Sequence, residues 1–451
     1  MRSCLAEFDV RRALLVLLLL PALARAQDLM ITHVRLFDGE RVHTDASVRV
    51  RGGRIAALLT ADDAPPSGTG VRLIDGKGLT LLPGLIDSHT HIQSRDDLVA
   101  SLAFGVTTDL SLHGQPSSDH AIRGGLSEAG ARDRADLYTA GFAATVPGGH
   151  GTEYGFAVPT ITVPSEAVDW VDARIAEGSD VIKIMYEEGG ENGRVKRPSI
   201  DAPTLAALIN AAHARNKLAL VHIHTDSQAM QAIRAGADGL AHLYLFGNDE
   251  VDPQFAPMLV KRKMFVIPTL TVLRSVCGLA PGREVLEDSR LALYLRVEDR
   301  ARLEKQIAVG KSSDYDRARA ALKQLLKYGV TILAGTDAHN PGTAPGASLH
   351  GELSFLVEGG MTPLEALRAA TSAPARVFHW SDRGRIAPGM RADLLLVDGD
   401  PTLDVTATRN IRTVWKSGIE FDRAAWRQRL ATGHAEGEHS SGELTVGVTA
   451  N

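Results

Sequence analysis

The stretch LPGLIDSHTH, from Leu82 to His91, decides the fold. It is an apolar run that ends in two histidines separated by one residue. Because successive side chains of a strand point to opposite faces, His89 and His91 leave the same face at the end of the strand. In a (β/α)8 barrel that face is the interior, and the carboxyl end of the strand carries the active site. Two imidazoles placed in this way can bind one metal ion.

The chain beyond this stretch alternates apolar strands with helical patterns. Predicted strands cover residues 85–91, 106–112, 137–142, 181–186, 218–224, 239–244, 266–272 and 331–337, and helical stretches include 165–177, 203–216, 227–235, 257–263 and 317–328. Eight strands with intervening helices predict an α/β fold of the (β/α)8 TIM-barrel type. A doubly wound open sheet is the alternative, but no glycine-rich phosphate-binding motif follows an early strand.

Both ends of the barrel region have a different character, with short strands broken by Gly and Asp turns. Residues 27–79 and 385–421 share this pattern, so we expect them to form one small β-sandwich domain that encloses a barrel domain at residues 80–384. Residues 422–451 form a C-terminal extension. Because its end is rich in Gly, Glu, His and Ser, we expect a disordered tail.

The first 26 residues predict a secretory signal peptide. Arg11 and Arg12 precede an apolar run that ends at Leu23, and Ala24-Arg25-Ala26 supplies the pattern of a cleavage site. The run is shorter than the roughly 20 residues of a membrane-spanning helix, so we expect no stable membrane anchor. After cleavage near Ala26 the mature chain would begin at Gln27 and be exported, to the periplasm or out of the cell.

Composition excludes several classes of protein. The 451 residues are 44% hydrophobic and 23% charged, with a formal net charge of -5. This argues against a disordered or coiled-coil chain and gives no support for a nucleic-acid partner. With Cys4 and Cys277 as the only cysteines, neither a disulfide framework nor a thiolate zinc cluster can be built. A small-molecule substrate is the expected partner, and a homo-oligomer is left open.

Metal-binding side chains recur at the ends of later strands. His222 and His224 repeat the spacing of the first pair, and His242 ends the next strand. Asp337 ends the last strand. Histidine or aspartate at four separate strand ends predicts a metal centre at the carboxyl edge of the barrel.

A lysine lies inside an otherwise apolar strand. Burial of Lys183 and nearby cations would lower the pKa of its amine. The neutral amine can add carbon dioxide, and the resulting carbamate is a bidentate oxygen ligand suited to bridging two divalent ions. The alternative is a lysine whose head reaches water at the strand end.

As a set, these residues resemble the amidohydrolase superfamily. Residues 82–91 resemble its first-strand signature, residues 335–339 (GTDAH) its eighth strand, and residues 392–394 (ADL) its returning C-terminal strand. The resemblance covers roughly residues 28–421. Within the superfamily it is nearest to the imidazolonepropionase-like and Xaa-Pro or Xaa-Arg dipeptidase-like branch, on residues 105–108, 148–151, 182–185 and 371–375.

The resemblance implies two divalent ions, with zinc favoured and manganese or cobalt as alternatives. The ligands of the buried ion would be His89, His91, Lys183 and Asp337, and those of the outer ion Lys183, His222 and His242. Between the two histidines of strand five the resemblance favours His222, although the geometry also allows His224. The run YEEGG at residues 186–190 departs from the family pattern, so the identity of the substrate is not carried over.

The implied activity is metal-dependent hydrolysis of a C–N bond, amide or peptide, in a small substrate. Two zinc ions supply a water acidified toward neutral pH. Asp337 would accept the water proton and pass it to the leaving group, Lys183 would hold both ions as its carbamate, and His150 would touch the substrate carbonyl or carboxylate. Further candidates for substrate contact are Tyr186, expected on the face of Lys183, together with His224 and His339.

Other functions remain compatible with this sequence. A lactonase or esterase could use the same site, because hydroxide attack does not require a nitrogen leaving group. A decarboxylase or an isomerase is a further possibility on this scaffold. A barrel that binds a ligand without catalysis is disfavoured, because every type of metal ligand is present.

Overall fold

The computed structural model describes residues 28–60, 70–124, 132–191 and 195–432. The predicted signal peptide and cleavage site lie outside the described residues. Within them, no helix combines the length and the apolar character needed to cross a membrane.

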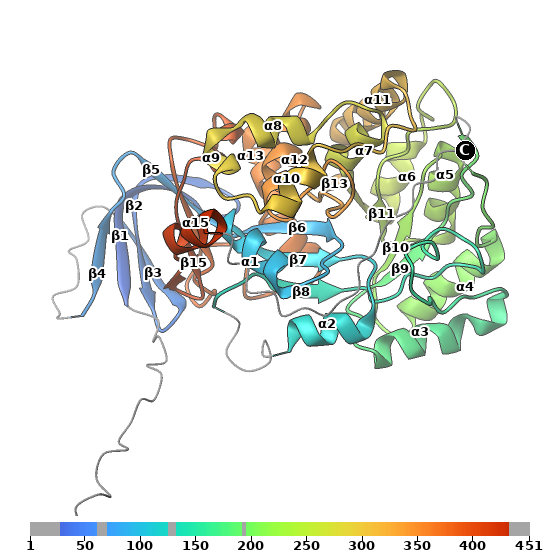
Figure 1. The fold of residues 1–451 in the computed structure, drawn as a ribbon, viewed down its shortest axis with the longest axis horizontal. Coiled ribbons are helices and arrows are strands. Elements are labelled where there is room, and N and C mark those ends of the chain that lie inside the picture. Colours follow the sequence, from blue (N-terminus) through green and yellow to red (C-terminus); the bar gives the residue numbers. More distant parts are fainter. Residues whose placement is uncertain (1–27, 61–69, 125–131, 192–194, 433–451) are drawn as a thin grey trace, which may run out of the picture.

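The centre of the molecule is a set of parallel strands that pair in chain order (Figure 1). One sheet contains β6 (Leu85–Thr90), β7 (Val106–Ser111) and β8 (Asp136–Thr139), and the other contains β9 (Ile182–Met185), β10 (Ala219–His222), β11 (Gly239–Ala241), β12 (Phe265–Ile267) and β13 (Thr331–Ile332). Parallel bridges Thr90–Ala338 and Ala144–Ile184 join the two sheets at both edges. The pairing therefore runs through all eight strands and returns to β6, and the predicted α/β class is confirmed.

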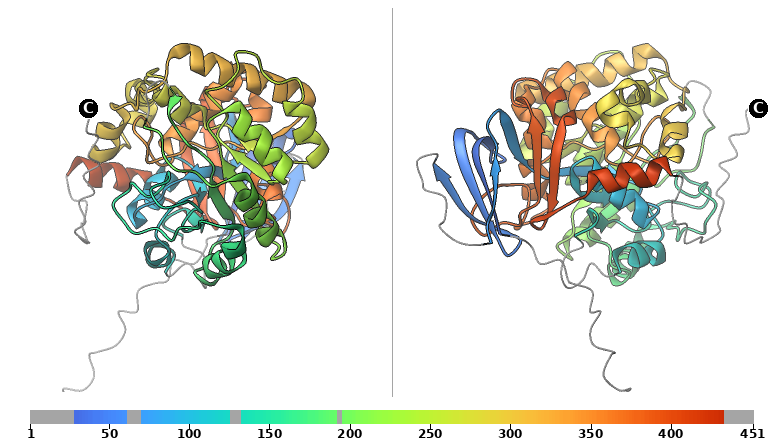
Figure 2. Two further views of the ribbon diagram at one scale, coloured as in Figure 1. Left: turned by 90° about the vertical axis from the view of Figure 1, so that its right-hand side faces the viewer. Right: turned by 60° about the vertical axis from the view of Figure 1, so that its left-hand side comes forward.

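Helices follow most of the strands and cover their outer side (Figure 2, left). They are α1 (Arg95–Ala103), α2 (Pro116–Arg123), α3 (Ala167–Ala176), α4 (Ala202–His213), α5 (Asp226–Ala235), α6 (Phe255–Arg262), α7 (Leu270–Val276), α8 (Gly282–Glu287), α9 (Ser289–Ala292), α10 (Val297–Leu303), α11 (Ser312–Tyr328), α12 (Ala347–Glu358), α13 (Pro363–Ala369) and α14 (Ser372–Val377). Many of their apolar faces form one buried cluster with the strands, including Leu208, Leu240 and Leu353. The buried apolar residues of α8, α9 and α10 belong to a separate cluster.

Local sequence explains where α5 begins and ends. The Thr225 hydroxyl accepts from the N–H of Gln228, and the Gln228 side chain accepts from the N–H of Thr225. This reciprocal pair satisfies two donors that the helix itself leaves unpaired. Gly236, with φ of 93°, ends the helix in the left-handed conformation that glycine adopts without strain.

The prediction of a strand over residues 266–272 was wrong beyond Ile267. Strand β12 ends at that residue because Pro268, which follows, has no N–H to donate to a neighbouring strand. Thr269 has a positive φ of 50°, and α7 begins at Leu270. This break brings the Thr269 hydroxyl into the site described below.

The two chain ends combine in a second sheet. It contains β1 (Leu29–Phe37), β2 (Val42–Arg51), β3 (Arg54–Thr60), β4 (Arg72–Asp75), β5 (Leu79–Pro83), β14 (Leu394–Asp398), β15 (Ile411–Lys416) and β16 (Ile419–Glu420). Strands β5 and β14 pair antiparallel, with Leu82 opposite Leu395, and so join the two ends (Figure 2, right). All these strands belong to one hydrogen-bonded sheet. Its description as a sandwich stays a prediction.

A buried ionic cluster holds this second sheet against the amino ends of the central strands. Lys416, at the end of β15, is fully buried and lies 2.9 Å from Asp136 at the start of β8 and 2.8 Å from Asp393. Arg383 adds a contact of 2.7 Å to Asp136. The opposite, carboxyl ends of the central strands are thus left for the site.

The prediction of a disordered extension was wrong for residues 423–431. These residues form helix α15 (Arg423–Ala431). Trp426 is 4% exposed, packs on Val99, Ala100 and Ala103, and donates from Nε1 to the Tyr294 carbonyl. A single large aromatic residue fixes the helix because it buries a large apolar area. Residues 433–451 lie outside the described part of the chain.

Candidate active site

The predicted metal ligands gather at the carboxyl ends of five central strands. His89 lies in β6 and His91 just beyond it, Lys183 lies in β9, His222 ends β10, His242 follows β11, and Asp337 follows β13. The centroids of the His89 and His242 rings are 4.8 Å apart, and those of the His242 and His222 rings 4.6 Å. The strand ends therefore form one continuous group of imidazoles.

Asp337 is the centre of the first cluster. Its Oδ1 lies 3.0 Å from Nε2 of His89 and 2.8 Å from Nε2 of His91. Burial alone would raise the pKa of Asp337, but the two facing imidazoles outweigh it and hold that pKa well below its usual range. These three residues form a group that could hold a metal ion, and their nitrogen and carboxylate donors suit zinc.

The tautomer of His91 supports a cation in this cluster. Its Nδ1 lies 3.1 Å from the carbonyl oxygen of His113, which can only accept, so Nδ1 carries a proton. In the neutral ring Nε2 is then a bare acceptor that faces the Asp337 carboxylate. Two acceptors at 2.8 Å repel each other unless a proton or a metal ion lies between them.

The side chain of Lys183 is buried next to the histidines. Its Nζ is 3.5 Å from Nε2 of His89. Burial lowers the pKa of the amine to about 7, although the charge of Asp337 opposes the shift. A large fraction of this lysine is therefore neutral at pH 7, as addition of carbon dioxide requires.

His242 also has its proton fixed by a neighbour. The Thr269 hydroxyl donates to the carbonyl of Pro268 at 2.8 Å. Its oxygen lies 2.7 Å from Nδ1 of His242 and must accept there, because its only proton is used. The lone pair of His242 is therefore on Nε2. His242 itself has a φ of 77°, in the left-handed region that non-glycine residues adopt uncommonly.

A second cluster surrounds Glu187, which the sequence analysis missed. Its Oε2 is 2.7 Å from Nε2 of His222 and 3.8 Å from Nε2 of His150, and its Oε1 is 3.3 Å from Nδ1 of His224. Burial would raise the pKa of this carboxyl, but the surrounding histidines hold it well below its usual range. His150, Glu187 and His222 form another group that could hold a metal ion.

The structure separates the two histidines of strand five. The His222 ring is next to His242, whereas the His224 ring packs against Phe246 at 5.3 Å. His150 lies beside His222, with 4.9 Å between the ring centroids, and its Nδ1 is 2.8 Å from Glu153. The predicted substrate contact His150 is therefore close to the ligand group.

The prediction that Tyr186 shares the face of Lys183 was wrong. Tyr186 follows the lysine by three positions, so it points to the opposite side of the strand. Its hydroxyl donates to Gln231 of α5 at 2.5 Å, among the helices. His339, another predicted contact, faces Asp97 at 3.0 Å and joins neither cluster.

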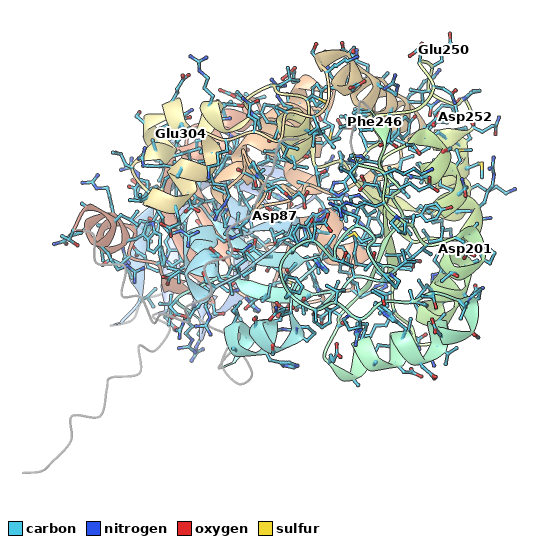
Figure 3. All side chains as sticks on the ribbon, turned by 45° about the vertical axis from the view of Figure 1, so that its right-hand side comes forward. Asp87, Asp201, Phe246, Glu250, Asp252 and Glu304 are labelled. Atoms are coloured by element: carbon cyan, nitrogen blue, oxygen red, sulfur yellow. The ribbon has the colours of Figure 1, made fainter. Side chains whose placement is uncertain are left out.

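Asp87 forms hydrogen bonds with the backbone segments that carry the first cluster. It accepts from the Thr336 hydroxyl at 2.7 Å and from the backbone N–H groups of His89 and Thr336 at 3.1 Å. These bonds tie β6 to the segment that carries Asp337. Burial raises the pKa of Asp87 to about 7, against the effect of these donors. Figure 3 shows Asp87 in the interior of the molecule, while Asp201 and Glu304 lie at its periphery.

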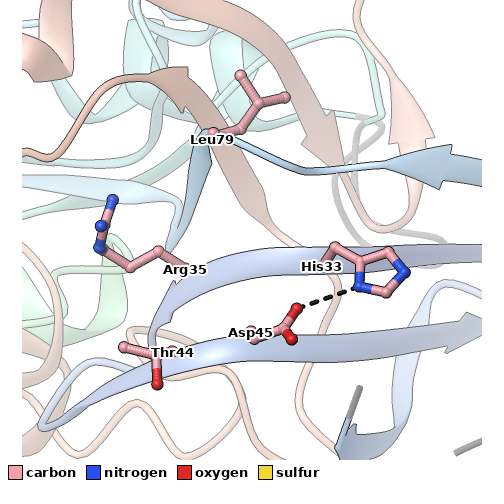
Figure 4. Close-up of a pocket in the computed structure, with 6 residues that line it drawn as sticks. His33, Arg35, Thr44, Asp45 and Leu79 are labelled. Atoms are coloured by element: carbon pink, nitrogen blue, oxygen red, sulfur yellow. Dashed lines mark hydrogen bonds and ion pairs between the residues drawn. The ribbon is translucent and has the colours of Figure 1, made fainter. Parts of the chain in front are cut away.

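A hollow of about 150 Å³ lies elsewhere, on the sheet of the chain ends (Figure 4). Its lining includes His33 and Asp45, which are 3.1 Å apart with side chains 52% and 61% exposed. Such an exposed pair contributes little stability. The hollow contains none of the metal-binding candidates.

Comparison with known proteins agrees with this geometry. Ochratoxinase of Aspergillus niger is 26% identical over 395 residues, which covers 76% of this chain and 75% of that protein. Imidazolonepropionase of Rubrobacter xylanophilus is 27% identical over 394 residues, covering 79% and 85%. A solved Xaa-Pro dipeptidase with bound methionine has the same fold, with a TM-score of 0.69 and 22% identity over 87% of this chain and 99% of that one. The model of the amidohydrolase family matches residues 80–420. The chain therefore belongs to the amidohydrolase family of hydrolases.

Proposed function

We propose that this chain is an exported amidohydrolase that uses two zinc ions, bridged by a carboxylated Lys183, to hydrolyse an amide or peptide bond of a small substrate. The observation that carries the proposal is the position of the lysine amine. It is buried 3.5 Å from Nε2 of His89, and the group of imidazoles continues from there through His242 to His222.

His89, His91, Lys183 and Asp337 would hold the buried ion, and Lys183, His222 and His242 the outer ion. The positions of the imidazoles support this assignment. When bound, two zinc ions supply a water acidified toward neutral pH and an electrophile for the scissile carbonyl. Since His222 is the strand-five histidine beside His242, we assign the ligand role to it and not to His224.

Carboxylation of Lys183 balances simply. The neutral amine forms a bond from Nζ to the carbon of carbon dioxide, and one proton leaves the nitrogen. The lysine changes from a cation, when protonated, to an anion with two oxygens. The other proposed ligands are several neutral imidazoles and one carboxylate, which carry less negative charge than two divalent ions carry positive charge. A further anionic ligand therefore suits the site.

The other residues act on the substrate and its protons. Asp337 accepts the proton of the attacking water and returns it to the leaving nitrogen. His150 lies at the edge of the second cluster, and its Nδ1 donates to Glu153. In its protonated form it would also donate from Nε2 to the carbonyl or carboxylate oxygen of the substrate. The leaving nitrogen must gain a proton, which Asp337 returns to it. His150 acts on the substrate oxygen instead, so the two residues have different tasks.

A substrate panel with the mature chain, residues 27–451, tests this function. The purified protein, loaded with zinc in the presence of bicarbonate, is assayed against dipeptides, N-acyl amino acids, cyclic imides and lactones. We expect turnover of at least one amide class, and its loss in Asp337→Asn. Turnover of lactones alone would replace the amidase assignment with a lactonase. For export, amino-terminal sequencing of protein from its native host should find Gln27.

A further inference from the structure

We propose that Glu187 is a positioning residue that keeps the proton of His222 on Nε2 and so turns Nδ1 of that ring toward the outer metal ion. The inference rests on the proposed dinuclear function and adds a residue to it. Glu187 lies in the loop after β9, four positions beyond Lys183, and its side chain is 3% exposed.

The hydrogen bond defines the tautomer. Oε2 of Glu187 lies 2.7 Å from Nε2 of His222. A carboxylate can only accept, so the imidazole donates from Nε2 and its lone pair is on Nδ1. A carboxylate behind a ligand histidine fixes the orientation of the ring and makes the other nitrogen a better donor to a metal.

His222 differs in this respect from the other ligand histidines whose tautomers are defined. His91 donates from Nδ1 to a carbonyl, and His242 donates from Nδ1 to the Thr269 hydroxyl. Both of those acceptors are neutral and leave Nε2 for a metal. His222 donates from the other nitrogen, and its acceptor is charged. Glu187 would therefore fix the tautomer of His222 in the form that leaves Nδ1 for a metal.

The second carboxylate oxygen keeps Glu187 in place. Oε1 is 3.3 Å from Nδ1 of His224, so the two histidines of strand five hold the carboxylate from both sides. This contact gives His224 a role without making it a ligand. The alternative is that Glu187 itself binds an ion together with His150 and His222, whose donor atoms all lie within 4.8 Å of one another.

Substitutions of Glu187 separate these roles when the affinity of each ion is measured. In Glu187→Gln the amide oxygen still accepts from His222, whereas in Glu187→Met nothing accepts. Glu187→Asp folds with the least disturbance and withdraws the carboxylate by one carbon. Glu188→Gln is the matched control, because Glu188 is the next residue, is 56% exposed and pairs with Lys196 at 3.2 Å.

Zinc release to a chromophoric chelator measures the two ions separately, and cobalt absorption reports their coordination. We expect Glu187→Met to weaken one of the two ions by about 10–100-fold, as loss of such a partner typically does, and to leave the other ion unchanged. Glu187→Asp should weaken the same ion less, Glu187→Gln should retain most of its affinity, and Glu188→Gln should match the wild type.

Several results would overturn the inference. Equal loss of the ion in Glu187→Gln and Glu187→Met would make Glu187 a direct ligand. Unchanged affinities in Glu187→Met and Glu187→Asp, with two ions in the wild type, would refute the inference alone. Fewer than two ions in the wild type would refute the proposed dinuclear function, and the inference with it.

Discussion

Nδ1 of His91 lies 3.1 Å from the carbonyl oxygen of His113, so the backbone of the neighbouring strand determines which nitrogen of His91 is available to a metal. The hydrogen bond joins the ends of β6 and β7. It holds Nε2 of His91 toward Asp337, 2.8 Å from Oδ1.

Removing this ring should empty the buried site. We expect elemental analysis to find two zinc ions per chain in the wild type and about one in His91→Ala, because the buried ion loses a donor that the fold holds in position. His213→Ala is the control. That histidine lies outside both clusters, pairs with Asp238 and is 42% exposed, so its removal should leave the metal content unchanged.

The bridge is tested by replacing Lys183. Lys183→Ala should lose both ions and several orders of magnitude in rate, and short carboxylates added to it should restore part of both, since they supply two anionic oxygens. Lys183→Arg should not be rescued, because its fixed positive charge repels the ions. Near-normal metal content in Lys183→Arg would make the lysine structural.

Carboxylation of the metal-free protein should depend on pH in a defined direction. A lysine reacts with carbon dioxide when neutral, and burial lowers the pKa of Lys183 to about 7. The neutral fraction therefore increases as the pH rises through 7. With ¹³C-labelled bicarbonate, the carbamate signal in NMR should increase over this range and be absent from Lys183→Ala. A signal that appears only near the ordinary pKa of lysine, roughly 10.4, would contradict the lowered value.

Asp337→Asn removes the carboxylate charge, and we expect it to preserve the fold. Asp337 has a φ of 59°, and asparagine is among the few residues that tolerate this conformation. The variant should therefore fold like the wild type. Its kcat should fall by about 10²–10⁴-fold, the usual effect of losing a general acid–base. A variant that retains full activity with two bound ions would exclude Asp337 as the proton acceptor.

Stability should depend on a buried charge network beside the site. Arg296 lies 2.8 Å from Asp97 and 2.6 Å from Asp299, and all three residues are buried. Arg296→Met removes the cation that the two carboxylates share, which leaves Asp97 with His339 and Asp299 with Arg302. It should cost up to about 3–5 kcal/mol of unfolding free energy in urea titrations. Arg283→Met, in an exposed pair with Glu287, should have no measurable effect.

The same network should make the free energy of unfolding depend on pH in the acid range. Burial opposes ionisation of Asp97, but His339 and Arg296 outweigh it and hold the pKa of that carboxyl well below its usual range. Its contribution is therefore present above the pKa of about 3.9 of the unfolded chain and is lost as the pH falls below it. Urea titrations at a series of acid pH values should show a steeper loss in the wild type than in Asp97→Asn.

The sequence could predict the ligands because their positions follow from strand periodicity. His89 and His91 share a face by spacing alone, and Asp337 ends an apolar run. Glu187 follows the same alternation from Lys183, by four positions, and could have been found in this way. Instead, Tyr186 was assigned to that face, although its spacing from the lysine is odd.

Other parts of the site do not follow from strand periodicity. The acceptor for His91 is a backbone carbonyl, which any residue type provides. The Thr269 hydroxyl reaches His242 because Pro268 ends β12 early. Pro268 does signal that break in the sequence, but the prediction followed the alternation of apolar residues around it instead. Helix α15 is held in place by the contact of Trp426 with α1. These two segments lie near opposite ends of the sequence, so a local pattern does not reveal their contact.

The pairing of β5 with β14 also affects how the chain is made. The Thr80 hydroxyl donates to the carbonyl of Gly399, 319 positions later in the sequence. Until the ribosome has added that late segment, β5 is paired only with β1, and its other edge is exposed to pairing with other chains. Chains truncated before residue 394 should therefore aggregate, and folding should be slow because so distant a contact must form. Early binding of a chaperone to this edge would protect the nascent protein.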